Sequence, residues 1–258
     1  MLILLPPSEG KVAPDAGQKL ALTALSWPGL KAVRSTILRA VVDLCTSSPT
    51  RAMRALGLTA SQKPLIAQNA RLRSAPTAHA IDVYAGVLYD ALDFSSLPAA
   101  ARTRADSRLA ITSALWGLVR PHDRIPAYRF SADSRVPGLP SLAQLWSTPI
   151  GSVITQEKGV IVDLRSGAYV AMAPIPEVCA DRAVTLRVLQ EKGGKLSVVS
   201  HHNKATKGRI TAALLTESRE PRSVDHLPEV LRSHGYRVED GRPSRTGVRS
   251  LDVIVHDL

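Results

Sequence analysis

The segment from Arg120 to Arg129 holds the chain's densest group of side chains that could do chemistry, in the order RPHDRIPAYR. It follows an apolar run, Leu109 to Leu115, that is typical of a buried strand. Two prolines restrict its backbone, and guanidinium groups on a stiff loop suit the binding of phosphate or carboxylate. Because unpaired charges are costly to bury, we expect this segment to lie outside the core. The alternative is a solvated loop with surface ion pairs.

A second candidate anion site comes just after the first expected strand, Leu2 to Leu5. Here Ser8 could donate a hydrogen bond to a phosphate oxygen and Lys11 could supply a positive charge, because loops at the carboxyl ends of buried strands are common ligand sites. The segment is not a P-loop, since the GxxxxGK(S/T) pattern is absent. A surface lysine near the chain terminus is the alternative interpretation.

A third candidate lies at the start of an expected helix, residues 204–216, which follows an expected strand, residues 196–200. A helix N-terminus already attracts anions, so basic side chains there add to the same field. The basic residues on its first two turns are Lys204, Lys207 and Arg209. Two adjacent histidines precede them, but neighbouring side chains on a strand point to opposite faces. We therefore expect no metal site.

Thr77 to Leu92 has the spacing of an amphipathic helix that carries two tyrosines. On such a helix Asp82, Gly86 and Tyr89 share one face, and Tyr84 lies on the neighbouring apolar face. A glycine inside a helix costs about 1 kcal/mol relative to alanine, so we expect another helix or a ligand to approach the backbone there. The alternative is that the tyrosines pack in the core.

The remaining pattern predicts the scaffold that must position these groups. The expected helices are residues 28–46, 50–56, 61–72, 77–92, 142–154 with an interruption at Pro149, a short helix around Tyr169, 204–216 and 224–234. The expected strands are residues 2–5, 109–113, 160–164, 186–189, 196–200, 236–239 and 251–256, with 186–189 and 196–200 paired across a turn at residues 192–194. No linker, repeat or low-complexity tract divides residues 1–258, so we expect one compact domain of the mixed α/β (α+β) class.

Composition limits the classes of function. The formal net charge is +11 and the sequence pI is about 10.1; residues 1–129 hold 16 Lys and Arg against 8 Asp and Glu. This balance favours nucleic acid or another polyanion as partner. Two cysteines without metal-ligand spacing indicate neither a disulfide framework nor a metal site. With no signal peptide and no long apolar run, we expect a cytoplasmic protein without membrane contact.

The segments above resemble the YaaA family, also called DUF328 or UPF0246, over nearly the whole chain. The most specific match is the pattern Gly-Leu-x-Arg-Pro-x-Asp-x-Ile-x-x-Tyr-Arg, present as Gly117 to Arg129. Further matching segments are residues 7–11, 82–90, 163–169 and 204–208. The resemblance implies a single-domain fold with a positively charged cleft, DNA binding, a link to hydrogen peroxide stress and a helix-hairpin-helix-like element, for which residues 53–73 are the local candidate.

Two functional hypotheses follow. The first is binding of duplex DNA, largely independent of its sequence, by a monomer without cofactors; the second is an enzyme that acts on a small anionic substrate, such as a nucleotide, in the same cleft. The expected anion-binding residues are Ser8, Lys11, Arg120, Tyr128, Arg129, Lys204, Lys207 and Arg209, with Asp82, Gly86 and Tyr89 in support. If the protein is an enzyme, Lys11 or Tyr84 is the expected general acid–base and Asp123 orients an arginine.

Overall fold

The computed structural model describes residues 1–192, 195–197, 200–242 and 247–256. Its strands are β1 (Leu2–Leu5), β2 (Ala78–His79), β3 (Leu109–Ser113), β4 (Gly117–Val119), β5 (Arg124–Ile125), β6 (Ile161–Asp163), β7 (Ala183–Lys192), β8 (Lys195–Ser197), β9 (Arg237–Asp240) and β10 (Arg249–His256). Its α-helices are α1 (Lys31–Ser47), α2 (Pro49–Ala55), α3 (Pro64–Ala70), α4 (Ala80–Val83), α5 (Val87–Leu92), α6 (Ala99–Arg108), α7 (Leu142–Gln156), α8 (Gly167–Met172), α9 (Ser200–Thr216) and α10 (Leu227–Ser233).

Eight strands form one mixed sheet, in the order β4-β3-β1-β6-β7-β10-β9 with β8 paired to β7. The five strands β3, β1, β6, β7 and β10 are mutually parallel, and β4, β8 and β9 add antiparallel pairs. Across the sheet, these parallel strands lie in the order β3, β1, β6, β7, β10. The strand that comes second along the chain therefore lies outside the first, and the third, fourth and fifth follow on the other side of the first. Sheets of this order bind ligands at the carboxyl ends of the first and third strands, where the chain reverses its direction of winding. In this protein those strands are β1 and β6.

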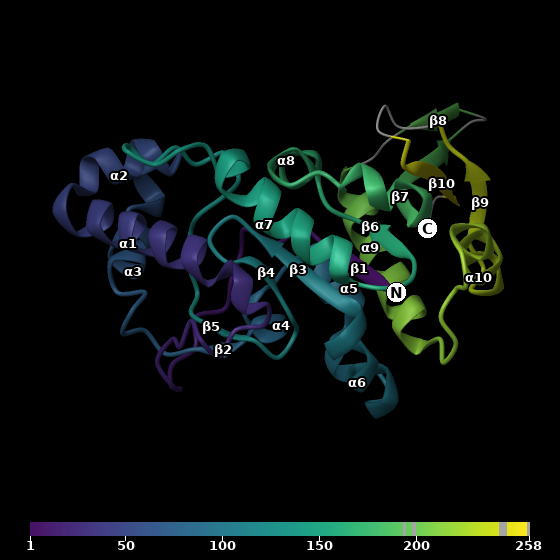
Figure 1. The fold of residues 1–258 in the computed structure, drawn as a ribbon, viewed down its shortest axis with the longest axis horizontal. Coiled ribbons are helices and arrows are strands. Elements are labelled where there is room, and N and C mark those ends of the chain that lie inside the picture. The colour runs from purple at the N-terminus through teal and green to yellow at the C-terminus, as the bar shows by residue number, and fades with distance from the viewer. Residues whose placement is uncertain (193–194, 198–199, 243–246, 257–258) are drawn as a thin grey trace.

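The strands have the apolar runs that a parallel sheet covered on both faces requires. All residues of β1 and β3 are buried. On one side α5, α6 and α9 pack together, with α9 against β7 and α6 against β1 and β3, and α7 contacts β4 and α8. Figure 1 shows α7 crossing in front of the sheet, α1, α2 and α3 gathered at one end of the molecule, and α10 with β9 at the other. No described helix is long and apolar enough to cross a membrane.

The mixed α/β domain predicted from the sequence is confirmed, and most expected elements are present within a few residues of their predicted bounds. Helix α7 runs through Pro149, so the predicted interruption is wrong. Helix α6 was not predicted. Ser200 begins α9 rather than ending a strand, whereas the predicted turn at Gly193-Gly194 and residues 198–199 lie outside the described residues.

The predicted helix from Thr77 to Leu92 is in fact two short helices, α4 and α5, separated by three residues that end in Gly86. Gly86 has φ of +102°, a backbone conformation that favours glycine. A Cβ at this position would have no atom within 4 Å, so the glycine is needed for its conformation and not for close packing. The close approach occurs at Gly208 of α9, where a Cβ would lie 2.2 Å from the Leu88 carbonyl oxygen. The predicted shared helical face of Asp82, Gly86 and Tyr89 is therefore wrong.

Candidate ligand cavity at the strand switch point

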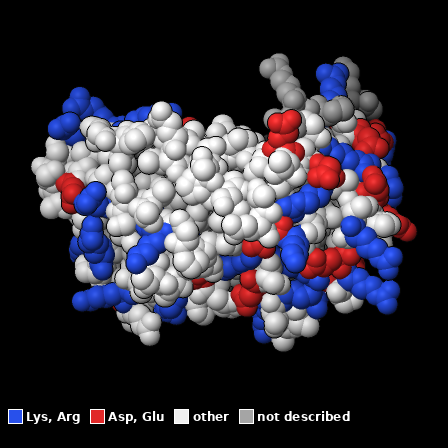
Figure 2. All heavy atoms as spheres, viewed as in Figure 1, with Lys and Arg blue, Asp and Glu red and all other residues white. Residues whose placement is uncertain are grey.

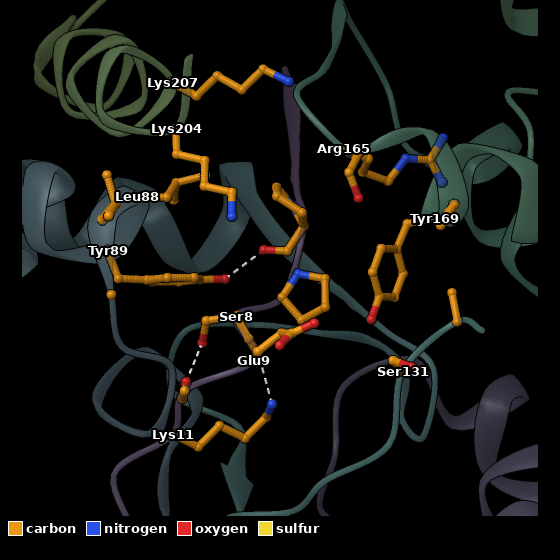
Figure 3. A pocket seen from close by; sticks show the side chains of 18 of the residues that line it. Ser8, Glu9, Lys11, Leu88, Tyr89, Ser131, Arg165, Tyr169, Lys204 and Lys207 are labelled. Atoms are coloured by element: carbon orange, nitrogen blue, oxygen red, sulfur yellow. Dashed lines mark hydrogen bonds between the residues drawn. The ribbon is translucent and has the colours of Figure 1, made fainter. Parts of the chain in front are cut away.

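A cavity of about 660 Å³ opens where β1 and β6 end, at the switch point of the sheet. Five chain segments line this switch-point cavity: residues 6–11 after β1, 85–89 at the start of α5, 129–133, 164–169 after β6, and Asn203, Lys204 and Lys207 on α9. The lining includes five basic residues and two acidic ones, Glu9 and Asp133. Figure 3 shows Lys11 and Lys204 entering the cavity from opposite sides.

Lys11 is held on the cavity floor by its backbone and by its amine. A β-bridge joins Lys11 to Tyr84, and the Val12 N–H donates to the Val83 carbonyl at 2.9 Å. The Nζ atom donates to the Ser8 carbonyl at 2.5 Å and lies 4.3 Å from the ring centroid of Tyr128. Burial lowers the pKa of Lys11 to about 7, assisted by the nearby Arg129 charge and opposed by Glu9. At neutral pH this amine is therefore partly unprotonated.

Tyrosines form the wall beneath Lys11. The Tyr84 and Tyr128 hydroxyls are 2.9 Å apart, and the Tyr128 hydroxyl lies 2.7 Å from Ser113 Oγ. Ser113 Oγ already accepts the N–H groups of Leu115 and Trp116, so it donates to Tyr128, and Tyr128 in turn donates to Tyr84. Burial raises the pKa of Tyr84, Tyr128 and Tyr89. The wall is therefore neutral at physiological pH.

Tyr89 and Ser8 complete this side of the cavity. Tyr89 stacks on Tyr84 with ring centroids 5.4 Å apart and donates its hydroxyl hydrogen to the Pro6 carbonyl at 2.8 Å. Ser8 Oγ donates to the Gly10 carbonyl at 2.6 Å and accepts the Ala85 N–H at 3.1 Å. These bonds fasten the loop after β1 to the start of α5.

The opposite side of the cavity carries the two lysines of α9. Gly208 lets α9 lie directly on α5, because any side chain there would strike the α5 backbone, and this contact places Lys204 and Lys207 at the cavity. Lys207 Nζ donates to the Leu164 carbonyl at 3.0 Å, and burial lowers its pKa. Lys204 is exposed and forms no ion pair within the described ranges. Its charge is available to a ligand.

The two arginines in the lining are more committed than the lysines. Arg129 pairs with Glu9 at 3.1 Å, and the buried side chain of Asn69 holds the Arg129 backbone through both its N–H and its carbonyl. Arg165 forms two hydrogen bonds to the Asp163 carboxylate, at 2.8 and 2.6 Å, and a third to the Ala173 carbonyl. Arg165 therefore has little capacity left for a ligand, and it fixes the chain after β6.

Arg120 and Asp123 do not line the cavity, and the expectation that their segment lies outside the core is wrong. Asp123 is 6% exposed; its carboxylate accepts the Ser26 N–H and hydroxyl and the Arg120 N–H. The Arg120 guanidinium pairs with Glu157 at 2.7 Å, donates to two carbonyls and stacks on Trp27. Asp123 can be buried because its carboxylate is hydrogen-bonded on both oxygens, and Arg120 is half-buried beside its partner Glu157.

Some of the other predicted residues line the cavity and others do not. Of the expected set, the cavity lining contains Ser8, Lys11, Gly86, Tyr89, Arg129, Lys204 and Lys207. Tyr84 and Tyr128 lie beneath Lys11. Asp82 is exposed and 3.7 Å from His79, and Arg209 is exposed next to Tyr236, so neither belongs to the cavity.

Sequence reasoning missed three residues that shape the site. Asn69 positions Arg129, Arg165 fixes the loop after β6, and Tyr169 lines the cavity with its hydroxyl towards Ser131 in Figure 3. The segment from Asp163 to Tyr169 was one of the family-like stretches, and that resemblance was the available signal for two of the three. Nothing in the spacing around Asn69 indicated its role.

The fold and the cavity define a single-domain α/β protein with a ligand cavity at the switch point of its sheet. A family model described as peroxide stress protein YaaA matches residues 1–242. The chain is 45% identical to a UPF0246 protein of Streptomyces coelicolor over the full length of both proteins. It is 41% identical to one of Corynebacterium efficiens over 93% of this chain and 95% of that protein. The chain belongs to the YaaA family of peroxide stress proteins.

Proposed function

We propose that the protein binds duplex DNA, largely independent of sequence, along a surface that runs from the α2–α3 helices to the mouth of the switch-point cavity. One observation carries the proposal. The segment between Asp43 and Asp82 contains no acidic residue. All five Lys and Arg residues of this segment are exposed: Arg51, Arg54, Lys63, Arg71 and Arg73. In the described part of the chain none of the five forms an ion pair, so their charges are free to neutralise phosphates.

The charge distribution over the surface supports this choice of face. Figure 2 shows Lys and Arg with few acidic side chains at the end of the molecule where α1 and α2 lie, whereas at the opposite end basic and acidic side chains are intermixed. Helix α3 and the end of helix α2 fall within residues 53–73, for which the family resemblance implies a helix-hairpin-helix-like element, and Gly57 turns the chain after α2 with φ of +63°. Such an element would contact phosphates rather than read bases.

A continuous chain segment connects this basic face to the cavity. Arg135 donates its backbone N–H to the Ala55 carbonyl of α2 at 2.8 Å. At the other end of the same segment, Arg129 lines the cavity and is clamped by Asn69 of α3. A DNA backbone lying on α2 and α3 would therefore meet the mouth of the cavity. By family membership we assign this binding to the protection of DNA during peroxide stress.

Matched charge reversals test the DNA proposal. We expect the Arg51→Glu/Arg54→Glu double variant to lose about two phosphate contacts, which lowers the slope of log K against log salt by roughly 1.8. The control, Arg219→Glu/Arg222→Glu, makes the same change in net charge with two exposed arginines in the segment that leads to α10, which Figure 1 shows at the other end of the molecule from α2, and it should bind almost normally. Fluorescence anisotropy with two unrelated duplexes at several salt concentrations gives both slopes. Equal losses in the two variants would reduce the effect to net charge and overturn the proposed face.

A second candidate function is an enzyme that acts on a small anionic substrate in the switch-point cavity. The specific observation is the composition of the lining: a nonspecific DNA surface needs only cations, whereas this cavity places Lys11 above a hydrogen-bonded tyrosine pair and faces it with Lys204. In this hypothesis Lys204 and Lys207 bind the anion and Lys11 lies closest to the reacting group.

Binding of inorganic phosphate and adenosine monophosphate tests the second function independently of DNA. A ligand that binds only the folded state raises the melting temperature by mass action. We expect millimolar phosphate to raise the melting temperature of the wild type and to raise it less in Lys204→Ala, whose own folding should be normal because the side chain is exposed. Lys31→Ala, an exposed lysine on α1, is the control. No stabilisation of the wild type by either anion would count against an anion site here.

A further inference from the structure

We propose that Lys11 is the nucleophile of a carbonyl-condensing site, whose substrate is an aldehyde or ketone that also carries a phosphate or carboxylate. The inference rests on the second proposed function and names its chemistry. Lys11 Nζ would attack the carbonyl carbon, a proton would pass from nitrogen to oxygen to give a carbinolamine, and loss of water would leave a carbon–nitrogen double bond to Lys11. Addition of water reverses the step, so no oxidant or further reactant is needed.

The first support is the fixed position of the amine. Residues 11 and 12 are tied to residues 83 and 84 through a β-bridge and a backbone hydrogen bond, so the side chain starts from a rigid point. Its Nζ lies 4.3 Å and 5.4 Å from the ring centroids of Tyr128 and Tyr84. Two aromatic rings on one side exclude water from that side and leave the cavity as the direction of approach.

The second support is the set of charges that faces the amine. Arg129 repels the protonated form and Glu9 attracts it, while the neighbouring tyrosines are neutral because burial raises the pKa of both. Burial is the largest effect, and it brings the pKa of Lys11 to about 7. A lysine amine is nucleophilic only when unprotonated, and desolvation next to another cation is a known way to produce that form.

The third support is the placement of the basic side chains on two sides of the cavity, with Lys11 on one side and the lysines of α9 on the other. Figure 3 shows Lys204 entering the cavity from the side opposite Lys11, and Lys207 lies one helical turn further along α9. A cavity of about 660 Å³ holds a small metabolite. A substrate with its anionic group on α9 would present its other end to Lys11. This arrangement selects for molecules that contain both groups.

Reductive trapping on the intact protein tests the proposal. Pyridoxal 5′-phosphate is a suitable probe because it joins an aldehyde to a phosphate; the wild type is incubated with it, reduced with sodium borohydride and mapped by peptide mass spectrometry. We expect Lys11 to be labelled at pH 7 at least about tenfold faster than exposed lysines such as Lys63, because an ordinary lysine has a pKa near 10.4. Pyridoxal without the phosphate should label Lys11 more slowly, and inorganic phosphate should compete.

Two variants and the wild-type map give decisive outcomes. Lys11→Arg keeps the charge without a nucleophilic amine and should lose the fast label, while Lys31→Arg, at an exposed lysine of α1, should keep it. If phosphate stabilises the wild type but the label spreads evenly over surface lysines, the anion site stands and the carbonyl chemistry is wrong. If phosphate neither stabilises nor competes, and Lys11 is not labelled, both the anion site and the carbonyl chemistry are wrong.

Discussion

The segment around Arg120 and the switch-point cavity are both rich in charge, yet they differ in what the charges do. Arg120 and Asp123 meet partners within the protein at nearly every polar atom. Lys204 has no ionic partner among the described residues, and Lys11 makes a single hydrogen bond through its amine. Charged side chains whose hydrogen-bonding capacity is used up hold the fold together, whereas those with capacity left are available to a ligand.

Arg34 is a buried charge that also holds the fold together, although its Nη1 atom has no hydrogen-bond partner among the described residues. This arginine of α1 is completely buried and donates to the Trp116 and Leu118 carbonyls at 2.8 and 2.7 Å. Burial lowers its pKa to about 10, opposed by the charge of Asp123. Helix α1 is thereby fastened to the strand that precedes Arg120. The family-like pattern from Gly117 to Arg129 therefore contains residues that maintain the fold as well as one, Arg129, that lines the cavity.

The largest effect is expected at Asp123. Replacement of Asp123 by alanine leaves the Ser26 and Arg120 N–H groups without their acceptor, and we expect a loss of about 2–4 kcal/mol in the free energy of unfolding. This corresponds to a fall in melting temperature of roughly 5–15 °C for a chain of this size. Calorimetry gives the stability, and phosphate stabilisation of the remaining folded protein gives the cavity's function. Unchanged stability with lost phosphate binding would place Asp123 in the ligand site after all.

A smaller effect of the same kind is expected for Arg120→Lys. An ammonium cannot reproduce the bonds to Glu157 and two carbonyls together with the stacking on Trp27, so the free energy of unfolding should fall by about 1–2 kcal/mol while DNA affinity stays the same. Arg129→Lys is the matched change inside the cavity and should alter phosphate binding more than stability. The reverse result for the two variants would break the comparison between the regions.

The sequence was sufficient for the fold class and for several members of the site, for physical reasons. Apolar runs such as Leu2–Leu5 and Leu109–Ser113 identify buried strands, and the elements at whose ends Ser8, Lys11 and Lys204 lie could be located from periodicity. Strand order could not be predicted, because it depends on contacts between segments far apart in the chain. Without it, nothing showed that residues 6–11 and 164–169 would meet at a switch point.

The sequence also could not predict which charged side chains are paired within the fold. Arg120 and Lys204 look equally free in the sequence, but the Glu157 that neutralises Arg120 is 37 residues away. The position of Gly86 was misassigned for a related reason. A glycine in an amphipathic pattern indicates either close packing or a positive φ, and only the tertiary structure assigns close packing to Gly208 and the positive φ to Gly86.

The smallest expected effect on stability concerns a third charged group, the Glu220 carboxylate near the amine of Met1. The Glu220 carboxylate pairs with the amine of Met1 and with Arg108, whose Nε lies 2.9 Å away. Burial alone would raise the pKa of Glu220, but its bonds and charge attraction to the Met1 amine and to Arg108 outweigh this and lower it below the usual 4.5. The folded protein therefore binds this proton less readily than the unfolded chain does.

Stability from Glu220 is thus complete above pH 4.5 and is lost as the pH falls through the lower folded value. Because the side chain is 41% exposed, we expect Glu220→Gln to lower the free energy of unfolding at pH 7 by only about 0.5–1 kcal/mol, with the difference from wild type shrinking in acid. Urea unfolding from pH 7 to pH 3 measures this, with Asp43→Asn as an exposed control that removes the same charge. If the difference in free energy of unfolding between the two proteins is the same at every pH, Glu220 acts through packing. The pairing of a charge within the protein would then not indicate that the charge stabilises the fold.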